Sequence, residues 1–307
     1  MADARFAEQQ AGADRHDAGR SAWAFGCFQW RGDLMLDEHS FDTGVVAINW
    51  GEGLLSGPPL VLLHGISMWW RTFTPVVPYL SERFHVYAVD FRGHGRSGRV
   101  PKGYRWEEYV RDTADFLRRV VGTPAYVLGH SLGGMVAIQL CAVAPELVRA
   151  VVLEDPPLYG YRGERLKMRP NYKLFLAWRS LAQQQPATDD LEARLSELQP
   201  ELNPSALSSR AESLRLLDPD VLTMYLDGVA TENYETDQYL RRIVCPTLIL
   251  RGDPALGGAI EEADELQARS LLKRCVIRRV WGVGHGIHPY QPDLYQQLVA
   301  EHFGAAG

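Results

Sequence analysis

The most regular feature of the chain is a series of short, continuously apolar runs separated by helix-like stretches. The runs cover residues 59–65, 84–90, 125–130, 149–154, 246–252 and 276–282. Half-buried strands alternate apolar and polar positions, whereas continuous runs of this length are typical of strands buried on both faces. Strands that alternate with helices predict a parallel sheet with right-handed crossovers.

One of the intervening stretches, which begins at Trp106, has a clear helical spacing. The positions on its inner face are Tyr109, Val110, Thr113, Phe116, Leu117 and Val120. Positions three and four residues apart share one face of a helix, so this face would pack against the sheet. Ahead of the first run, residues 40–50 read as a further strand.

The alternation stops between residues 156 and 242. Helix-like segments occur there near 164–183, 189–199, 205–217 and 219–230, with Pro and Gly between them. Such an insertion would lie over the carboxyl ends of the strands, where α/β proteins bind ligands. We therefore expect a core at 35–155 and 243–303, a helical cap at 156–242, and a partly disordered N-terminal extension at 1–34.

Charge and composition narrow the possible partners. The 307 residues carry a net charge of −6, which argues against nucleic acid and against an anionic membrane surface. The sequence has no apolar run of about 18 residues, and its first residues do not resemble a secretory signal. We expect a cytoplasmic protein that acts on a small molecule, and the sequence leaves the oligomeric state open.

The most informative motif is Gly-His-Ser-Leu-Gly at residues 129–133, with Ser131 at its centre. It directly follows the strand-like run AYVL and directly precedes the helix-like run MVAIQLCAV. A serine nucleophile on a sharp strand-to-helix turn requires this context. The glycines allow a tight turn, and the helix that follows would help to stabilise a developing anion. We predict that Ser131 is a nucleophile.

A second motif, His64-Gly65-Ile66, stands at the end of the first apolar run. There the chain can turn a backbone N–H group into the site. We expect the N–H groups of Ile66 and Leu132 to form a two-donor oxyanion hole. Taken alone, a His-Gly pair after a strand would be an ordinary loop.

A serine hydroxyl needs a neutral imidazole within hydrogen-bond reach to become a nucleophile. His285 lies between two glycines after the last apolar run, which fits the chain order serine, acid, histidine. His288 is the alternative base, but it lacks the flanking glycines.

Five segments together resemble the α/β-hydrolase family, in particular its esterases, lactonases and related enzymes. They are LLHGISMWW (62–70), DFRGHGRSG (90–98), GHSLGG (129–134), CPTLILRGD (245–253) and GVGHGIHPYQPDLY (282–295). The resemblance implies an α/β fold with an eight-stranded, mostly parallel sheet flanked by helices, a serine-acid-histidine triad and an inserted helical cap. The serine argues against the epoxide hydrolases and haloalkane dehalogenases of this fold, which place Asp at that position.

The position of the triad acid departs from the usual pattern of the family. The acid normally follows the strand equivalent to 246–251, but Ala255 stands at that position here. Asp155 lies 24 residues after Ser131 and begins Asp-Pro-Pro, as in zearalenone-type lactonases. We therefore favour Asp155 as the acid, with Asp253 as the alternative.

These features predict a serine hydrolase that cleaves a carboxylic ester or lactone of a bulky apolar molecule through an acyl-enzyme. Aromatic residues of the insertion suggest an apolar pocket. The reaction would need no cofactor and no metal. A C–C bond hydrolase of ring-cleavage dienoates is the enzymatic alternative, and it would need cationic or polar groups for the substrate carboxylate. A small-molecule receptor on the same fold is the non-enzymatic alternative.

Overall fold

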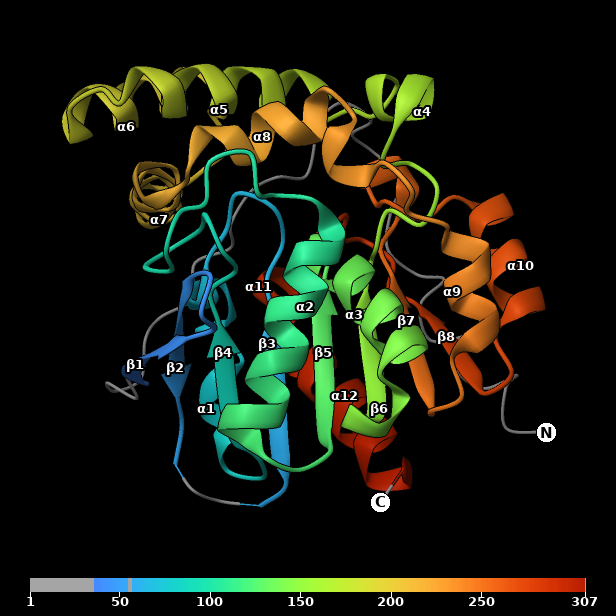
Figure 1. Ribbon diagram of the computed structural model, residues 1–307. Helices are drawn as coiled ribbons and strands as arrows, with labels where there is room; N and C mark the ends of the chain where they lie inside the picture. The colour runs from blue at the N-terminus through green and yellow to red at the C-terminus, as the bar shows by residue number, and fades with distance from the viewer. Residues whose placement is uncertain (1–35, 55–56, 307) are drawn as a thin grey trace.

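The computed structural model describes residues 36–54 and 57–306, which form an eight-stranded sheet with the order β1-β2-β4-β3-β5-β6-β7-β8 (Figure 1). The last six strands in chain order run parallel, and β1 and β2 are antiparallel to their neighbours. The strands are β1 (Asp37–Asp42), β2 (Ala47–Glu52), β3 (Pro59–Leu63), β4 (His85–Val89), β5 (Ala125–His130), β6 (Val148–Glu154), β7 (Thr247–Arg251) and β8 (Cys275–Arg279).

The predicted strand at residues 40–50 is a hairpin of two strands, so the prediction was wrong in this detail. The chain turns between Asp42 and Ala47, where Thr43 N–H donates to the carbonyl of Val46. The Asp42 carboxylate accepts from the N–H of Gly44, whose φ of 92° is favourable only for glycine. The turn signal Asp-Thr-Gly therefore interrupts what reads as one strand.

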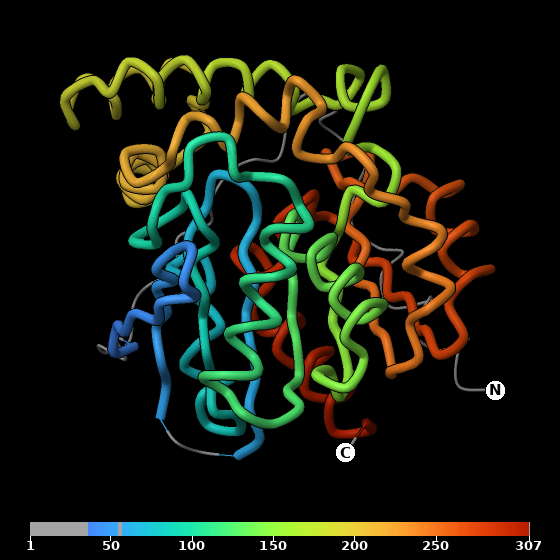
Figure 2. Tube along the Cα trace, in the orientation of Figure 1, coloured from blue at the N-terminus to red at the C-terminus, as the bar shows by residue number. Residues whose placement is uncertain are grey.

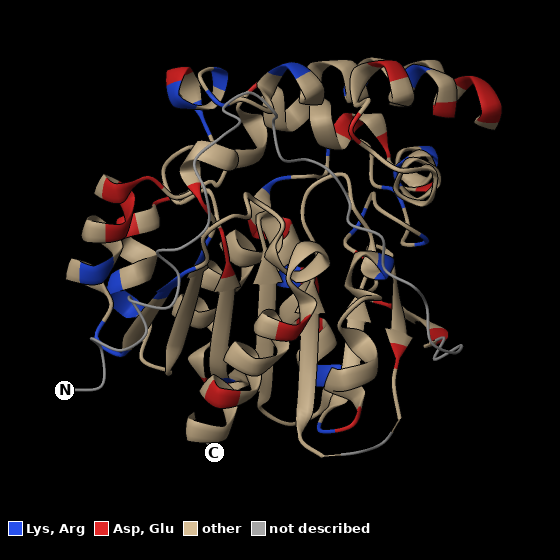
Figure 3. Cartoon of the chain, turned by 180° about the vertical axis from the view of Figure 1, so that it is seen from behind, with Lys and Arg blue, Asp and Glu red and all other residues tan. Residues whose placement is uncertain are grey.

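Helices cover both faces of the sheet and bury an apolar cluster on each face. One cluster includes residues of α2 (Trp106–Phe116), α3 (Leu132–Val143), α9 (Thr236–Arg242) and α10 (Glu262–Leu271). The other includes residues of α1 (Val77–Ser81), α11 (Ile287–Tyr290) and α12 (Pro292–Ala306). The strands carry few charged residues, and the charges gather on the outer helices (Figure 3). Burial by helices on both faces explains why central strands such as β3 and β5 are continuously apolar, whereas β1 and β8, at the two edges of the sheet, carry charged residues.

A helical layer lies across the carboxyl ends of the parallel strands, as Figures 1 and 2 show. It consists of α4 (Gly163–Lys167), α5 (Tyr172–Gln184), α6 (Thr188–Leu198), α7 (Pro204–Leu216) and α8 (Pro219–Leu226). These helices occupy the range expected for the cap. The same range includes α9, which packs beside α3 in the core (Figure 1). The expected N-terminal extension, residues 1–34, lies outside the described residues.

Short 3₁₀ turns connect several elements, at Trp70–Phe73, Pro145–Leu147, Val229–Thr231 and Pro254–Leu256, and α2 continues into a π-helical turn at Leu117–Val121. Within residues 36–54 and 57–306, no helix has both the length and the apolar character needed to span a bilayer.

Candidate active site

Ser131 occupies the sharp turn between β5 and α3, with φ 53° and ψ −112°. This backbone is strained for a residue other than glycine, and such strain is common where a side chain must be presented to a ligand. The neighbouring glycines are needed because the chain passes very close to itself. A Cβ on Gly129 would lie 2.3 Å from the carbonyl oxygen of Gly133, and one on Gly133 would lie 2.0 Å from that of Leu63.

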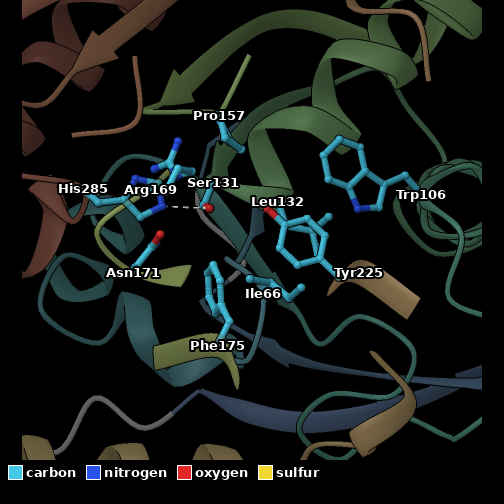
Figure 4. A pocket seen from close by; sticks show the side chains of 10 residues that line it. All are labelled: Ile66, Trp106, Ser131, Leu132, Pro157, Arg169, Asn171, Phe175, Tyr225 and His285. Atoms are coloured by element: carbon cyan, nitrogen blue, oxygen red, sulfur yellow. Dashed lines mark hydrogen bonds between the residues drawn. The ribbon is translucent and has the colours of Figure 1, made fainter. Parts of the chain in front are cut away.

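Ser131, His285 and Asp155 form a continuous hydrogen-bonded chain. The Ser131 hydroxyl donates to Nε2 of His285 at 2.8 Å, the bond drawn in Figure 4. Nδ1 of His285 donates to Oδ2 of Asp155, also at 2.8 Å. Asp155 follows β6 and is fully buried, and His285 lies in the loop after β8. The carboxylate is therefore able to orient the imidazole and stabilise its protonated form.

Backbone groups from a neighbouring loop fix the Asp155 carboxylate. Its Oδ1 accepts from the N–H of Gly252 at 3.1 Å, and its Oδ2 accepts from the N–H of Ala259 at 2.6 Å. The alternative acid, Asp253, instead accepts from the N–H of Ala255 at 2.9 Å and caps a 3₁₀ turn. The structure thus brings Asp155 to His285 and turns Asp253 to a local capping role.

His288, the alternative base, is fully buried and binds another carboxylate. Its Nδ1 lies 2.8 Å from Oε2 of Glu154, and its Nε2 lies 3.2 Å from the hydroxyl of Thr72. Glu154 also accepts from the backbone N–H groups of Ile287 and His288. These contacts hold α11, which directly follows the loop of His285.

A third imidazole, that of His130, packs against both of these histidines, with ring centroids 4.9 Å from His285 and 5.2 Å from His288. Burial lowers the pKa of His130 to about 3, so the ring is neutral at physiological pH. A neutral neighbour does not oppose the positive charge that His285 must accept. His130 also explains Gly65, because a Cβ there would lie 2.8 Å from Nδ1 of His130.

Two backbone N–H groups adjoin the serine. Ile66 and Leu132 both line the pocket that contains Ser131. Neither N–H donates a hydrogen bond within residues 36–54 and 57–306. Both N–H groups therefore remain candidates for the expected oxyanion hole.

The pocket lies between the carboxyl ends of the strands and the helical layer. Its lining residues are Ile66, Trp106, Ser131, Leu132, Pro157, Arg169, Asn171, Phe175, Tyr225 and His285 (Figure 4). In this view Arg169 and Asn171 lie on the side of His285, and Trp106 and Tyr225 lie on the opposite side. The cavity volume is only about 20 Å³, space for a water or two.

The large apolar residues of the insertion and of the segment LLHGISMWW (62–70) differ in whether they reach this pocket. Phe175 lines it, whereas Met168 is 81% exposed and Trp69 and Trp70 are buried in the cluster beneath the sheet. Trp106 and Tyr225 were not predicted as pocket residues. Trp106 has the helical spacing of a core residue, and nothing local distinguishes Tyr225 from other apolar positions of the insertion.

The sequence also gave no sign of the two polar residues in the pocket, Arg169 and Asn171. Arg169 is half-buried and donates from Nη1 to the carbonyl of Ala259 at 3.3 Å. Among the described residues no carboxylate pairs with it. Asn171 is buried, and its Oδ1 has no hydrogen-bond partner in the described part of the chain. Both lie between α4 and α5, inside the range 164–183 that the sequence predicts as one helical segment, so their position in the pocket was not expected.

Comparisons with known proteins agree with this architecture. The model of the alpha/beta hydrolase family matches residues 60–298. The 2-(acetamidomethylene)succinate hydrolase of Mesorhizobium japonicum is 34% identical over 276 residues, which cover 86% of this chain and 94% of the relative. A human serine hydrolase-like protein is 32% identical over 138 residues, 42% of this chain and 67% of that protein.

A solved structure is similar in fold. The crystal structure of E-2-(acetamidomethylene)succinate hydrolase superposes with a TM-score of 0.70 at 24% identity, covering 88% of this chain and 99% of that chain.

Proposed function

The chain belongs to the alpha/beta hydrolase family, and from this premise we propose that it hydrolyses a small carboxylate-bearing substrate through an acyl-enzyme on Ser131. The observation that carries the proposal is the hydrogen-bonded series Ser131–His285–Asp155, beside a pocket lined by Arg169, a cation with no carboxylate partner among the described residues.

The reaction follows from the positions of these groups. Ser131 Oγ attacks the acyl carbon while Nε2 of His285 accepts its proton, and Asp155 stabilises the imidazolium. The N–H groups of Ile66 and Leu132 bind the carbonyl oxygen as it becomes negative. His285 then returns the proton to the leaving atom, and the bond to the acyl carbon breaks. Water, activated by His285, hydrolyses the acyl-enzyme and regenerates Ser131.

We infer the substrate class from the two polar residues that line the pocket, Arg169 and Asn171. Arg169 can bind a carboxylate through two parallel hydrogen bonds, and the amide of Asn171 can complete the contact. A bulky apolar ester or lactone would leave the cation desolvated without a partner, which is costly.

The relative from Mesorhizobium japonicum supports this choice, since its name specifies a succinate, a dicarboxylate, with an acetamido group. Ring-cleavage dienoates, the alternative considered from the sequence, also carry a carboxylate, whereas the bulky ester or lactone does not. The comparison thus favours the alternative over the ester or lactone. An amide nitrogen leaves by the steps described above, and a carbon leaves in this way only where a conjugated carbonyl of the substrate accepts its bonding electron pair.

Three substrates distinguish these possibilities: a simple aryl ester, a ring-cleavage dienoate, and 2-(acetamidomethylene)succinate. We expect one of the two carboxylate-bearing compounds to have a kcat/KM at least about tenfold above that of the aryl ester. A charged hydrogen bond between Arg169 and the substrate carboxylate is strong enough to raise kcat/KM by about this factor. A clear preference for the aryl ester would contradict the substrate class while leaving the serine mechanism intact.

Replacing Arg169 tests the contact itself. Arg169→Met should lower kcat/KM for the carboxylate-bearing substrate by about tenfold or more, chiefly through KM, and should change the aryl ester far less. Arg194→Met is the matched control, since Arg194 is an exposed arginine of the same helical layer. Equal losses on charged and uncharged substrates would show that Arg169 does not bind the carboxylate.

Ser131→Ala tests the chemistry. The change removes the nucleophile with little loss of packing, and we expect activity to fall by about 10⁴-fold or more. A fluorophosphonate should label the wild-type protein at Ser131 and leave the variant unlabelled. The non-enzymatic receptor would give neither turnover nor labelling. Retention of one tenth of wild-type activity in Ser131→Ala would exclude Ser131 as the nucleophile.

A further inference from the structure

A buried arginine of the helical layer reaches the loop that carries one oxyanion donor. Arg210 of α7 is only 7% exposed. Its Nη1 donates to the carbonyl of Ser67 at 3.2 Å and approaches the Ser67 hydroxyl at 3.4 Å. Its guanidinium lies 4.4 Å above the ring centre of Trp178 in α5. The contacts therefore join two helices of the layer to the loop after β3.

Burial of Arg210 in these surroundings lowers the stability of the fold. Among the described residues no carboxylate pairs with it, and its Nε has no hydrogen-bond partner there. Burial lowers the pKa of Arg210 to about 10, so the side chain is still charged at neutral pH. A cation removed from water without a counter-ion costs stability. Such a residue suggests a functional reason for its position.

The partner of Arg210 has an unusual backbone. Ser67 is fully buried and has a φ of 60°, a left-handed conformation that is unfavourable for serine. Ile66 and Ser67 are the two central residues of a turn that the Met68 N–H closes on the carbonyl of Gly65, so a change at the Ser67 carbonyl can shift the Ile66 N–H two peptide units before it. The hydrogen bond from Arg210 opposes relaxation of this strained residue to an ordinary conformation.

We propose that Arg210 is a positioning residue that holds Ser67, and through it the Ile66 N–H, in the orientation needed to bind the developing oxyanion. The inference rests on the proposed function of Ser131. Arg210 does not line the pocket, so its effect is transmitted through the loop. Trp178 in turn packs against Phe175, which lines the pocket, with ring centroids 5.6 Å apart. The oxyanion donor is then correctly placed only when the helical layer is seated on the sheet.

The test separates binding from catalysis. Arg210→Met retains most of the volume and removes the donor, so we expect kcat to fall by about tenfold to a hundredfold with KM within about threefold of wild type. Labelling of Ser131 by a fluorophosphonate should slow by a similar factor, because phosphonylation also places negative charge on an oxygen. Arg215→Met is the matched control, since Arg215 is an exposed arginine of the same helix, and it should behave as wild type.

Arg210→Lys provides a second variant in case the methionine variant does not fold. It retains the charge but cannot both lie flat on Trp178 and donate in the same geometry, so we expect a smaller fall in kcat in a protein with wild-type circular dichroism. Near-wild-type kcat in a folded variant would overturn the proposal. A rise in KM of tenfold with kcat unchanged would also overturn it, because Arg210 would then act in substrate binding. If wild-type protein neither turns over substrate nor reacts with the fluorophosphonate, the proposed function itself has failed.

Discussion

At the scale of single residues, the two candidate acids differ in what surrounds them. Asp155 is fully buried and accepts from two backbone N–H groups as well as from His285. Asp253 accepts from the N–H of Ala255 in its own turn. A carboxylate held from several sides can orient an imidazole, whereas one engaged in a local cap has no such role.

We therefore expect Asp155→Asn to reduce kcat by orders of magnitude, about 10⁴-fold in the triad that is best understood, because asparagine stabilises the wrong tautomer of the histidine. Asp253→Asn should reduce kcat by no more than a few-fold, since asparagine also caps turns well. Steady-state kinetics of both variants, with circular dichroism as a check on folding, measures this difference. A nearly fully active Asp155→Asn variant would show that the acid is misassigned.

At the scale of elements, the four-residue helix α11 is too short to be stable by itself and depends on its anchor. Glu154, at the end of β6, accepts from the N–H groups of Ile287 and His288 and from Nδ1 of His288. Burial by itself would raise the pKa of Glu154, but electrostatic attraction and hydrogen bonds from His288 outweigh it and lower the pKa to about 2, from 4.5 in the unfolded chain.

Because the folded pKa is depressed, the ionised carboxylate stabilises the fold above pH 4.5, and this contribution is lost as the pH falls from 4.5 toward 2. We expect Glu154→Gln to be less stable than wild type by on the order of 3 kcal/mol at pH 7, with a difference that narrows below pH 4.5.

Urea unfolding at several pH values measures this difference. Glu164→Gln, an exposed glutamate whose side chain is 80% accessible, should differ little from wild type at any pH. A Glu154→Gln deficit that is the same at pH 3 and pH 7 would contradict the assignment of the effect to the charge.

At the scale of the whole molecule, the strands and their loops position Ser131, His285 and Asp155, and the helical layer covers the pocket beside them. Phe175 of α5 and Tyr225 of α8 face Ser131 across a cavity of only about 20 Å³. No substrate of the proposed kind enters such a space without movement of the layer. Opening and closing of this layer would therefore accompany each turnover.

Hydrogen exchange measured by mass spectrometry tests this expectation. In the free protein, amides of α5 and α8 should exchange faster than those of α3, which is buried in the core. Phosphonylation of Ser131 by a bulky fluorophosphonate should change exchange in α5 and α8 and leave α12 unaltered. Exchange of α5 and α8 as slow as that of α3 would indicate a rigid layer and a different route of entry.

The sequence by itself determined the features that depend on neighbouring residues. Continuous apolar runs specify buried parallel strands, and the described residues form such a sheet. Ser131 was identifiable because the strand, the glycines and the helix around it are adjacent in the chain. Three of the helical segments expected in the insertion lie close to α6, α7 and α8, whereas the segment expected near 164–183 is divided into α4 and α5, and α9 was not expected. The hairpin of β1 and β2 was missed because its turn is short.

Only the tertiary structure decided which side chains meet across long separations in the chain. It brought Asp155 to His285, 130 residues apart, and left Asp253 and His288 with other partners. It placed Arg169 in the pocket and Arg210 against Ser67, 143 residues away. No local pattern marks such residues, because their role depends on how the helical layer seats on the sheet, and this is set by packing over the whole interface rather than by the residues beside them.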